Sequence, residues 1–375
     1  MKDWPRRVAI LGLGVIGGSF GMALRRLDDP PRVAGWSRRA ETAPRAVERG
    51  AVDEAAPDAA TAAEGADLVY IATPVGSIAE LALKVAGGLA PGAIITDGGS
   101  TKKSIVQALA GRLPEGVVYI GGHPMAGSER TGIDAARADL FDSAYYLLTP
   151  TDETDTASYR RLHGLLTRMG TNVVAIDPDT HDSAVAAISH VPHLIASALV
   201  NLATEQAAGN PNLLRMAAGG FKDMTRIAAG SPEMWADICA TNAPAIGEML
   251  ARFRIQLDQL GGAVAGQRKD QVARELERAA QVRRELPQLW QVEAADLVEV
   301  LVPMSDHPGV ISDVTMTIGA LGINIEDIEI AHESATAAVL RLVVDDAPRL
   351  AEAMAALRER GFDAQARPLS DLEPD

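Results

Sequence analysis

One short segment of the chain combines side chains that can do chemistry: Gly122-His123-Pro124-Met125-Ala126-Gly127-Ser128-Glu129. Histidine has an ordinary pKa near neutrality, so His123 can accept a proton or bind a substrate hydroxyl at physiological pH. The glycines that bound this loop are also compatible with a capped turn that has no catalytic role. A nucleotide-type turn upstream and a second His/Arg cluster downstream favour the catalytic interpretation.

The downstream cluster comprises Ser189-His190-Val191-Pro192-His193 and, further on, Gly219-Gly220-Phe221-Lys222-Asp223-Met224-Thr225-Arg226. His190 and His193 have a spacing that suits a metal on a helix, but no acidic triplet nearby completes such a site, so we predict no metal. Substrate contact and helix packing remain alternatives for both histidines. The Arg226 guanidinium can clamp a carboxylate with two hydrogen bonds or form an ordinary surface ion pair.

The upstream turn is Gly12-x-Gly14-x-x-Gly17, which lies between an apolar strand, Val8 to Leu11, and a predicted helix. The first glycine permits the sharp turn, the second lets the backbone approach a pyrophosphate, and the third lets helix and strand pack closely. The helix N-terminus adds positive partial charge. We therefore predict that this turn binds a dinucleotide.

The chain reads Trp36-Ser37-Arg38-Arg39 after the second predicted strand, where an NAD site usually places an acidic residue against the ribose hydroxyls. No carboxylate occupies this place. A hydroxyl followed by guanidinium groups suits the 2′-phosphate of NADP, whereas solvated arginines would leave NAD as the cofactor. The residues themselves favour NADP, and NAD remains an alternative.

A hydroxyl residue, Ser100, lies in Asp97-Gly98-Gly99-Ser100-Thr101-Lys102, directly after the strand predicted from Ala93 to Thr96. His123 follows the next strand, predicted from Val117 to Ile120. Because the carboxyl ends of parallel strands meet at one edge of a sheet, we expect Ser100 and His123 to lie near the cofactor. A hydride-transfer enzyme needs such groups to hold its substrate and to manage the released proton.

The elements that must position these residues form three parts. Residues 1–177 alternate strands and helices, which predicts an α/β domain with a doubly wound parallel sheet of the Rossmann type. Residues 178–290 are predicted to be all-helical, and their apolar faces favour a homodimer, with packing inside the domain as the alternative. Residues 297–375 read βαββαβ, which favours a regulatory or structural domain. The other predicted strands are Val33 to Trp36, Leu68 to Ala72, Tyr145 to Leu148 and Val173 to Ile176, and the predicted helices of the middle part are Ala184 to Leu202, Pro232 to Leu260 and Gln267 to Arg284.

Composition excludes several classes of protein. The formal net charge of −15 and the lack of a basic stripe argue against nucleic acid as a partner. Cys239 is the only cysteine, so no intramolecular disulfide forms and a cytoplasmic localisation is expected. The apolar run from Val8 to Leu24 resembles a signal peptide or membrane anchor, but glycines interrupt it, so we expect no membrane partner.

Together the motifs resemble those of the prephenate dehydrogenase family. They occur in the family's order over roughly residues 8 to 260, and only the glycine turn is shared widely with other dehydrogenases. The C-terminal part resembles an ACT domain, a small-molecule-sensing module. The motifs are Gly12-x-Gly14-x-x-Gly17-Gly18-Ser19, Asp97-x-x-Ser100-x-Lys102, the His123 segment, Ser189-His190-x-Pro192-His193, Gly220-Phe221-Lys222-Asp223-x-Thr225-Arg226-Ile227-Ala228, Met234-Trp235 and, for the ACT domain, Asp306-x-Pro308-Gly309-Val310 and Gly322-Ile323-Asn324-Ile325.

The resemblance implies oxidative decarboxylation of prephenate to 4-hydroxyphenylpyruvate in tyrosine biosynthesis, with hydride transfer to NAD or NADP. It implies that His123 accepts the proton of the substrate's ring hydroxyl, that Ser100 orients His123 and touches the nicotinamide, and that Arg226 holds a substrate carboxylate. The implied substrate site further includes His193, Ser128, Glu129, His190 and Trp235. The implied cofactor site comprises Gly12, Gly14, Val15, Ile16, Gly17, Ser37, Arg38, Thr73, Pro74 and Ser100, and the ACT resemblance implies an amino-acid effector such as tyrosine near Asp306, Gly309, Val310 and Asn324.

Several alternatives stay open. Lys222 stands where the family often has arginine, which leaves the implied role of Arg226 intact, and the sequence does not separate prephenate from arogenate as substrate. A dual-substrate cyclohexadienyl dehydrogenase is therefore an alternative. A β-hydroxyacid dehydrogenase would rely on a catalytic lysine in the helical part and leave the His123 segment without a role. A dinucleotide-dependent amino-acid sensor would bind its ligands without turnover.

Overall fold

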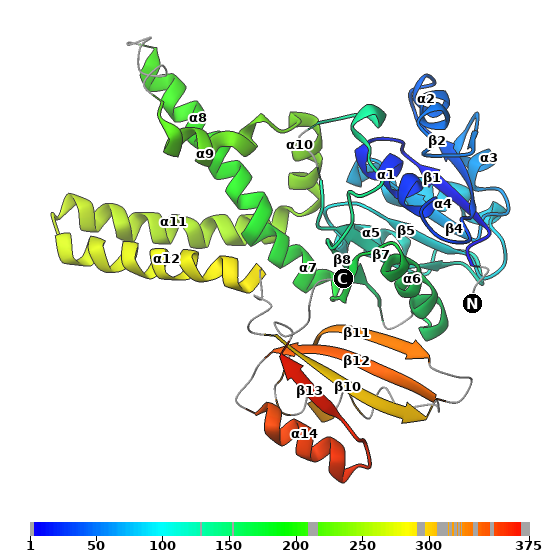
Figure 1. Cartoon of the computed structure of the whole chain (residues 1–375). Helices are drawn as coiled ribbons and strands as arrows, with labels where there is room; N and C mark the ends of the chain where they lie inside the picture. Colours follow the sequence, from blue (N-terminus) through cyan, green and yellow to red (C-terminus); the bar gives the residue numbers. More distant parts are fainter. Residues whose placement is uncertain are drawn as a thin grey trace. The chain divides into compact units, whose positions relative to one another are not determined.

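The chain divides into two compact units, Met1–Gln256 and Leu257–Asp375, in the computed structural model shown in Figure 1. The structure describes residues 4–127, 130–151, 154–208, 217–290, 297–305, 314, 317–318, 321, 323, 325–332, 337–345 and 349–368. Six residues of the predicted substrate and effector sites lie outside this set: Ser128, Glu129, Asp306, Gly309, Val310 and Asn324.

A six-stranded parallel sheet forms the centre of the first unit, with the strand order β3-β2-β1-β4-β5-β6. All four residues of β4, Leu68-Val69-Tyr70-Ile71, are buried, as expected for a strand of a sheet that is covered on both faces. The predicted Rossmann-type fold is therefore confirmed. The strand bounds are β1 (Arg7–Leu11), β2 (Arg32–Trp36), β3 (Glu54–Ala55), β4 (Leu68–Ile71), β5 (Ile94–Asp97) and β6 (Val118–Tyr119).

Helices cover both faces of this sheet (Figure 1). Side chains alternate between the faces along a strand, so Ile10 and Tyr70 belong to one buried cluster, whereas Ala9 and Ile71 belong to the other. The sheet is thus doubly wound, and in such sheets ligands bind at the carboxyl edge. The first cluster includes residues of α1 (Val15–Leu24), α2 (Thr42–Glu48) and α6 (Thr156–Arg168), and the second includes residues of α3 (Ala59–Ala63), α4 (Val75–Val85) and α5 (Lys103–Leu109).

The chain leaves the parallel sheet after β6. The next three strands, β7 (Gly121–Pro124), β8 (Tyr145–Thr149) and β9 (Asn172–Ala175), form a separate sheet in which β7 and β8 are antiparallel. The prediction of one parallel sheet is therefore wrong for these last strands. Glycine is required at Gly122, because a Cβ there would come within 2.5 Å of the carbonyl oxygen of Asp97. This close approach brings His123 next to the end of β5.

The helical part breaks where the sequence analysis predicts continuous helices. The predicted helix from Ala184 to Leu202 is α7 (Pro178–Val185), a π turn (Ala186–His190) and α8 (Val191–Ala207). Pro192 has no N–H to donate, which accounts for the irregular turn before it. The predicted helix from Pro232 to Leu260 is α10 (Pro232–Thr241) and α11 (Ala243–Ala265), separated at Asn242.

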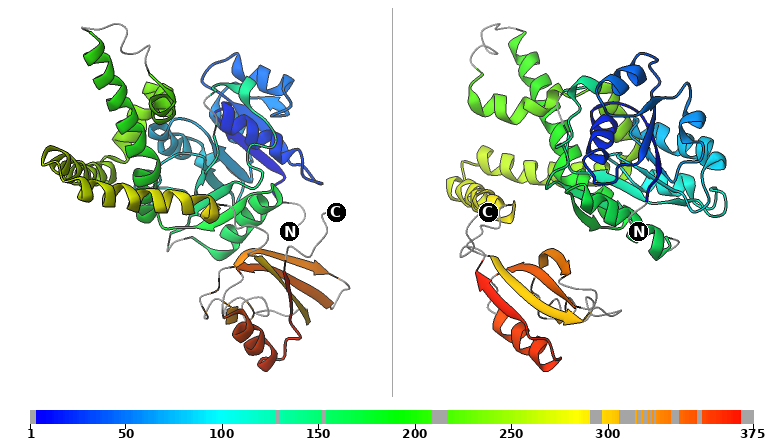
Figure 2. Two further views of the ribbon diagram at one scale, coloured as in Figure 1. Left: turned by 60° about the vertical axis from the view of Figure 1, so that its left-hand side comes forward. Right: turned by 45° about the vertical axis from the view of Figure 1, so that its right-hand side comes forward.

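The remaining helical elements are α9 (Gly219–Thr225), a 3₁₀ turn (Arg226–Ala229) and α12 (Lys269–Trp290). The two views of Figure 2 show α8 extending away from the parallel sheet, with α9 beside it. The segment Pro178–Ala207 is long and apolar enough to cross a membrane by length and composition alone, a test that the core helix of a soluble protein also passes. No other described helix passes that test. Because buried His181, Asp182 and His190 lie on this segment, we interpret it as part of the helical layer.

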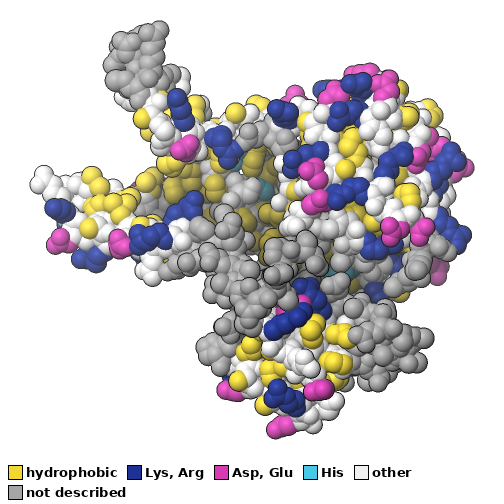
Figure 3. Space-filling view, viewed as in Figure 1, with side chains coloured by type: hydrophobic (Ala, Val, Ile, Leu, Met, Phe, Trp, Pro, Cys, Tyr) yellow, Lys and Arg dark blue, Asp and Glu magenta, His cyan; other side chains and the backbone are white. Residues whose placement is uncertain are grey.

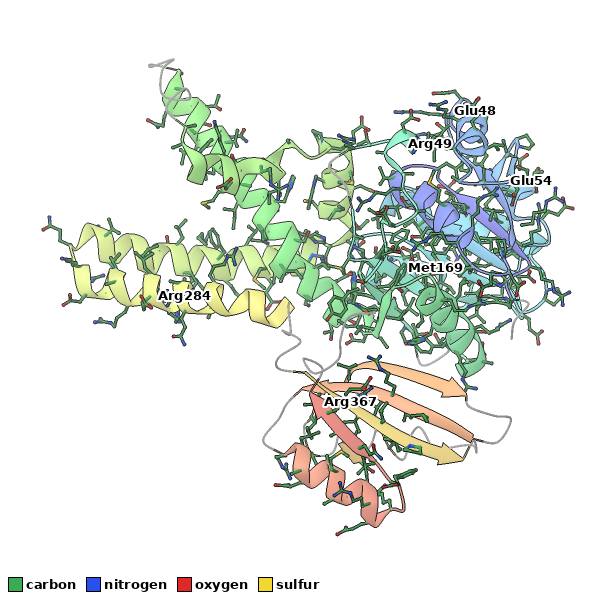
Figure 4. All side chains as sticks on the ribbon, in the orientation of Figure 1. Glu48, Arg49, Glu54, Met169, Arg284 and Arg367 are labelled. Atoms are coloured by element: carbon green, nitrogen blue, oxygen red, sulfur yellow. The ribbon has the colours of Figure 1, made fainter. Side chains whose placement is uncertain are left out.

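The C-terminal domain of the second unit is a four-stranded antiparallel sheet with the order β11-β12-β10-β13. Val300 and Leu342 are buried in its core against Leu357 of α14. On the other side of the sheet, the buried Glu299 carboxylate pairs with Arg341 and with Arg367, which is labelled on β13 in Figure 4. The elements are β10 (Leu297–Ser305), β11 (Ile325–His332), β12 (Ala337–Asp345), α14 (Leu350–Glu359) and β13 (Gln365–Pro368).

Candidate active site

The glycine turn forms the floor of a cleft of about 380 Å³ at the carboxyl edge of the parallel sheet. Gly12 has a φ of +101°, and a Cβ there would lie 2.4 Å from the carbonyl oxygen of Ala72. A Cβ on Gly14 would have no neighbour within 4 Å, so the backbone is open to the cleft at this point. Gly14 also precedes α1 without a side-chain cap, so that helix start can offer its N–H groups to a phosphate. These features fit the pyrophosphate of a dinucleotide.

The structure places most of the predicted cofactor residues around this cleft. The residues predicted from the sequence that line it are Gly12, Gly14, Ser37, Arg38, Thr73 and Pro74. Four predicted members do not line it. Val15 and Ile16 begin α1 and pack against the core, and Gly17 lies beneath the turn, where a Cβ would meet the carbonyl oxygen of Gly12 at 1.9 Å. Ser100 is half-buried on the loop after β5.

Two exposed arginines, Arg38 and Arg39, line the end of the cleft that follows β2. Among the described residues, neither guanidinium takes part in an ion pair or side-chain hydrogen bond. Both cations can therefore bind an anion without first breaking a contact. This arrangement is compatible with the 2′-phosphate of NADP.

A buried ion pair lies directly behind the loop that holds Ser100. The Lys102 ammonium pairs with Asp97 and donates to the carbonyl oxygen of Gly122 at 2.8 Å. Asp97 also accepts from the Tyr119 hydroxyl at 2.6 Å. Burial lowers the pKa of Lys102, and the nearby Asp97 carboxylate opposes that shift. The pair ties the end of β5 to the strand that carries His123.

His123 is half-buried on β7, and its Nδ1 lies 2.9 Å from Nε2 of His181. His181 Nδ1 lies 2.8 Å from Oδ1 of Asp182, so three side chains form a continuous line of hydrogen bonds. Burial lowers the pKa of His123 well below its usual range, and the proximity of His181, Lys102 and His190 lowers it further. His123 is therefore a neutral imidazole, and thus a base, at neutral pH.

Neither His181 nor Asp182 belongs to the site residues predicted from the sequence. Their signal was present: Asp177 caps α7 by accepting from the N–H groups of Asp179 and Thr180, and Pro178 occupies the first turn. This capping pattern begins the helix before the predicted start at Ala184, and it places the His-Asp pair inside the helix. The hydrogen-bond partner of His123 in the structure is His181, whereas Ser100 lies half-buried on the neighbouring loop.

Asn242 links the His-Asp pair to the downstream cluster. Its Nδ2 donates to the carbonyl oxygen of Asp182 at 2.8 Å and lies 3.2 Å from Nδ1 of His190. His190 is buried, and burial lowers its pKa to about 4. The rings of His190 and Trp235 form a T-shaped pair, with their centroids 6.0 Å apart. Pro244 in the first turn of α11 accounts for the break after α10, and the Asn242 side chain at that break serves the site.

Trp235 stacks on His193, with ring centroids 3.6 Å apart and the planes 12° from parallel. His193 is buried, and its Nδ1 has no hydrogen-bond partner among the described parts of the chain. Gly230 is essential to this packing, because a Cβ there would come within 2.6 Å of the Trp235 Nε1. Arg226 lies in the same region, exposed at the start of the 3₁₀ turn that packs against α8.

Two carboxylates of the helical part anchor it to the parallel sheet. Asp182 accepts from the backbone N–H groups of Lys102 and Lys103 at the start of α5, at 2.8 and 3.1 Å. Asp237 on α10 accepts from the N–H of Gly76 in the first turn of α4, at 2.8 Å. The arrangement therefore holds a neutral histidine base at the carboxyl edge of a dinucleotide-type sheet, which suits a hydride transfer coupled to proton removal.

Comparisons with known proteins identify three successive domains in this chain. Residues 20–175 match the family model described as prephenate dehydrogenase, nucleotide-binding domain, and residues 177–278 match prephenate dehydrogenase, dimerization domain. Residues 298–362 match the ACT domain. The matches follow one another along the chain in the order in which the motifs occur.

Individual relatives are similar over most of their length. The chain is 34% identical to prephenate dehydrogenase of Bacillus subtilis (strain 168) over 331 residues, which is 88% of both proteins. It resembles a crystal structure of prephenate dehydrogenase from A. aeolicus in complex with hydroxyphenyl propionate and NAD+, with a TM-score of 0.71, 30% identity and coverage of 75% of this chain and 98% of that one. It also resembles Synechocystis arogenate dehydrogenase, with a TM-score of 0.64, 32% identity and coverage of 75% and 99%.

Proposed function

Because this chain belongs to the prephenate dehydrogenase family, we propose that it performs the NAD(P)-dependent oxidative decarboxylation of prephenate with His123 as the base. The observation that carries this assignment is the neutral imidazole of His123, held by hydrogen bonds beside the carboxyl edge of the dinucleotide-type sheet. The product is 4-hydroxyphenylpyruvate, an intermediate of tyrosine biosynthesis.

His123 manages the one proton that moves during the reaction. It accepts the proton of the ring hydroxyl as hydride leaves the carbon that bears this hydroxyl. The bond between the ring and the leaving carboxylate breaks, and its electron pair enters the ring. NAD(P)+ supplies the hydride acceptor. His123 then returns the proton to the phenolic oxygen, so prephenate and NAD(P)+ yield 4-hydroxyphenylpyruvate, carbon dioxide and NAD(P)H. Aromatisation drives the step, and the protein mainly has to position and polarise the substrate.

Other residues of the cluster hold the substrate in this proposal. Arg226 binds a carboxylate that stays on the substrate, because strong pairing of the leaving carboxylate would oppose its loss. The stacked His193 and Trp235 form a rigid wall, and the unpartnered Nδ1 of His193 can meet a polar substrate atom. His190 supports that wall through Trp235, and Ser100 contacts the nicotinamide end. Ser128 and Glu129 lie outside the described residues, and their proposed contact with the substrate rests on the family resemblance alone.

We also propose that the active protein is a homodimer that binds an amino-acid effector such as tyrosine at its ACT domain. Ile188, Leu202 and Met224 of the helical part are 68%, 54% and 63% exposed, and Figure 3 shows hydrophobic side chains gathered along α8 and the helices next to it. A second copy would cover such a surface. The match of residues 177–278 to a dimerization domain supports this proposal.

The test is a matrix of NAD or NADP against prephenate or arogenate, with and without tyrosine, followed by absorbance at 340 nm. We expect turnover of prephenate and, because Arg38 and Arg39 line the ribose end of the cleft, a lower KM for NADP than for NAD. Exclusive turnover of arogenate would instead favour the activity named for the Synechocystis relative. Binding of cofactor without turnover of either substrate would support a sensor and refute the enzyme assignment.

His123→Asn tests the base directly. It should lower kcat by roughly a hundredfold or more, because an amide cannot accept the hydroxyl proton. His163→Asn is the matched control: His163 is also half-buried but lies on α6 beside Tyr159 and Thr167. Unchanged kcat in His123→Asn would remove His123 from the mechanism.

A further inference from the structure

We propose that His181 is a positioning residue that fixes the tautomer of His123. Held by Asp182, it keeps the proton of His123 on Nδ1 and so leaves the Nε2 lone pair free for the substrate hydroxyl. This inference rests on the proposed role of His123 as the base and adds a residue that lies outside the sequence motifs.

The polarity of the hydrogen bonds follows from the carboxylate at their end. Ionised Asp182 has acceptors only, and it already accepts from the N–H groups of Lys102 and Lys103. His181 Nδ1, at 2.8 Å, must therefore donate to Asp182. A neutral His181 then offers Nε2 as an acceptor, so the 2.9 Å contact requires a proton on Nδ1 of His123.

Burial makes this polarity costly to reverse. His181 is 0% exposed and Asp182 is 3% exposed, so water cannot replace a lost partner without rearrangement. At the start of α5, both carboxylate oxygens of Asp182 accept from backbone N–H groups, Oδ1 from Lys102 and Oδ2 from Lys103. In the described part of the chain, four other charged or titratable groups interact with the pair: Lys102, which is matched by Asp97, Lys103, which is matched by Asp179, Tyr119, and His190 from the π turn.

The same hydrogen bonds persist after His123 accepts the proton on Nε2, because Nδ1 already carries its own proton and continues to donate to His181. A purely structural His181 would fill space and cap Asp182 but would not influence which nitrogen of His123 carries the proton. The two roles therefore predict different results for substitutions of similar size.

Two amides separate the two ends of His181. Because the amide of glutamine reaches as far as Nε2, His181→Gln keeps an acceptor that faces His123. The amide of asparagine reaches only as far as Nδ1, so His181→Asn keeps a donor for Asp182 but loses contact with His123. We expect His181→Asn to lower kcat about a hundredfold with KM for prephenate and cofactor almost unchanged, whereas His181→Gln stays within about fivefold of the parent kcat.

Long-range proton–nitrogen NMR of the histidine rings gives a readout that does not depend on turnover. The chain has only 7 histidines, so selective labelling and single substitutions can assign them. In the parent and in His181→Gln, the His123 signals should report a protonated Nδ1 and an unprotonated Nε2. In His181→Asn, the proton should move to Nε2 or exchange between the two nitrogens. His163→Gln should leave the His123 signals and kcat unchanged, because His163 contacts Thr167 and Tyr159 on α6.

The outcomes separate this inference from the proposed function. An unprotonated His123 Nδ1 in the parent protein would overturn the inference even if His123→Asn is inactive. Equal loss of kcat in the Gln and Asn variants, with the parent tautomer retained in both, would reduce His181 to a structural role and also overturn it. If the tautomers are as expected but His123→Asn is fully active, the direction of the hydrogen bonds is confirmed. His123 is then not the base, and the proposed function is refuted in that respect.

Discussion

His123 lies in surroundings that oppose a positive charge, and this determines the pH range in which it can act. Its pKa lies well below the ordinary histidine value of about 6.5, first because of burial and then because His181, Lys102 and His190 are close. We therefore expect kcat/KM to stay near its maximum as the pH falls through 6.5 and to decline only well below it. A pH profile of kcat/KM for prephenate measures this directly. An acid limb centred at or above pH 6.5 would contradict a depressed pKa.

Acid unfolding must be separated from protonation of the base. His190 has a pKa of about 4 in the folded protein, so between pH 6.5 and 4 the unfolded chain binds more protons than the folded one. The contribution of His190 to stability is complete above about pH 6.5 and decreases as the pH falls through that window. Circular dichroism at each pH of the activity profile shows which process occurs first.

Arg226 is predicted to contribute to substrate binding more than to the chemical step. Arg226→Ala should raise KM for prephenate by about tenfold to a hundredfold, the usual loss for a charge-assisted hydrogen bond, with a smaller change in kcat. Arg252→Ala is the control, since Arg252 is an exposed arginine paired with Glu248 on α11. Steady-state kinetics with varied prephenate would show an unaffected KM if the Arg226 side chain lies outside the pocket.

Some residues of the site could be predicted from sequence and others could not. The positions of His123 and Ser100 near one edge of the sheet could be predicted because each follows a strand of the parallel series, and ligands bind at the carboxyl edge of such sheets. Their roles in the reaction stay predictions. His181 is 58 positions from His123 in the chain. It contacts His123 only because α7 packs on α5. Short-range sequence patterns do not predict such contacts, although Asp177-Pro178 is a typical helix start and would have predicted α7.

At the scale of the element, the Asp97–Lys102 pair fixes β5, its following loop and β7 in one arrangement. Both side chains are completely buried, and Asp97 also accepts from Tyr119. Lys102→Met keeps the volume but leaves a buried carboxylate unpaired, so it should lower the free energy of unfolding by about 3–5 kcal/mol. Urea denaturation followed by fluorescence or circular dichroism measures this change.

Lys103→Met is the matched control for that variant. Lys103 is the next residue, but its ion pair with Asp179 is exposed, so the substitution should change the free energy of unfolding by no more than about 0.5–1 kcal/mol. A second variant, Lys102→Met with Asp97→Asn, should recover part of the lost stability because no unpaired charge remains. Equal effects of the two single lysine substitutions would contradict a special role for the buried pair.

Elements with strong local patterns were predicted well, whereas breaks were not. Strands such as β1 and β4 are continuous apolar runs between turn residues, and their observed bounds lie within one residue of the predicted ones. The break at Asn242 comes two residues before Pro244, which has no N–H for a continuous helix and gives a local signal that the predicted helix from Pro232 to Leu260 ignored. The use of the Asn242 side chain to bridge Asp182 and His190 is instead a tertiary contact that no local pattern reports. The switch from the parallel sheet to β7 likewise depends on the approach of Gly122 to Asp97, which is a tertiary contact.

At the scale of the whole molecule, the first unit joins two layers through charged caps. Asp182 and Asp237 belong to the helical part, and their carboxylates accept from N–H groups at the start of helices that cover the sheet. Asp182 caps α5, and Asp237 caps α4. A carboxylate in this position satisfies otherwise unpaired donors and interacts favourably with the helix dipole. The line from Asp182 to His123 therefore couples the relative placement of the two layers to the orientation of the base.

The C-terminal domain has its own core, which predicts that catalysis and effector binding can be separated. Its core lies within residues 298–364 and includes Val300, Leu342 and Leu357. The Glu299 carboxylate forms ion pairs with two arginines of the same sheet, Arg341 and Arg367. A chain that ends at residue 296 should keep kcat and KM within about twofold but lose inhibition by tyrosine, since a typical allosteric coupling is about fivefold or more. Parallel assays of both chains over a tyrosine series measure this, with the oligomeric state checked by light scattering. Inhibition that persists unchanged in the shortened chain would place tyrosine in the active site, as a competitor shaped like the product, and would leave the C-terminal domain without this role.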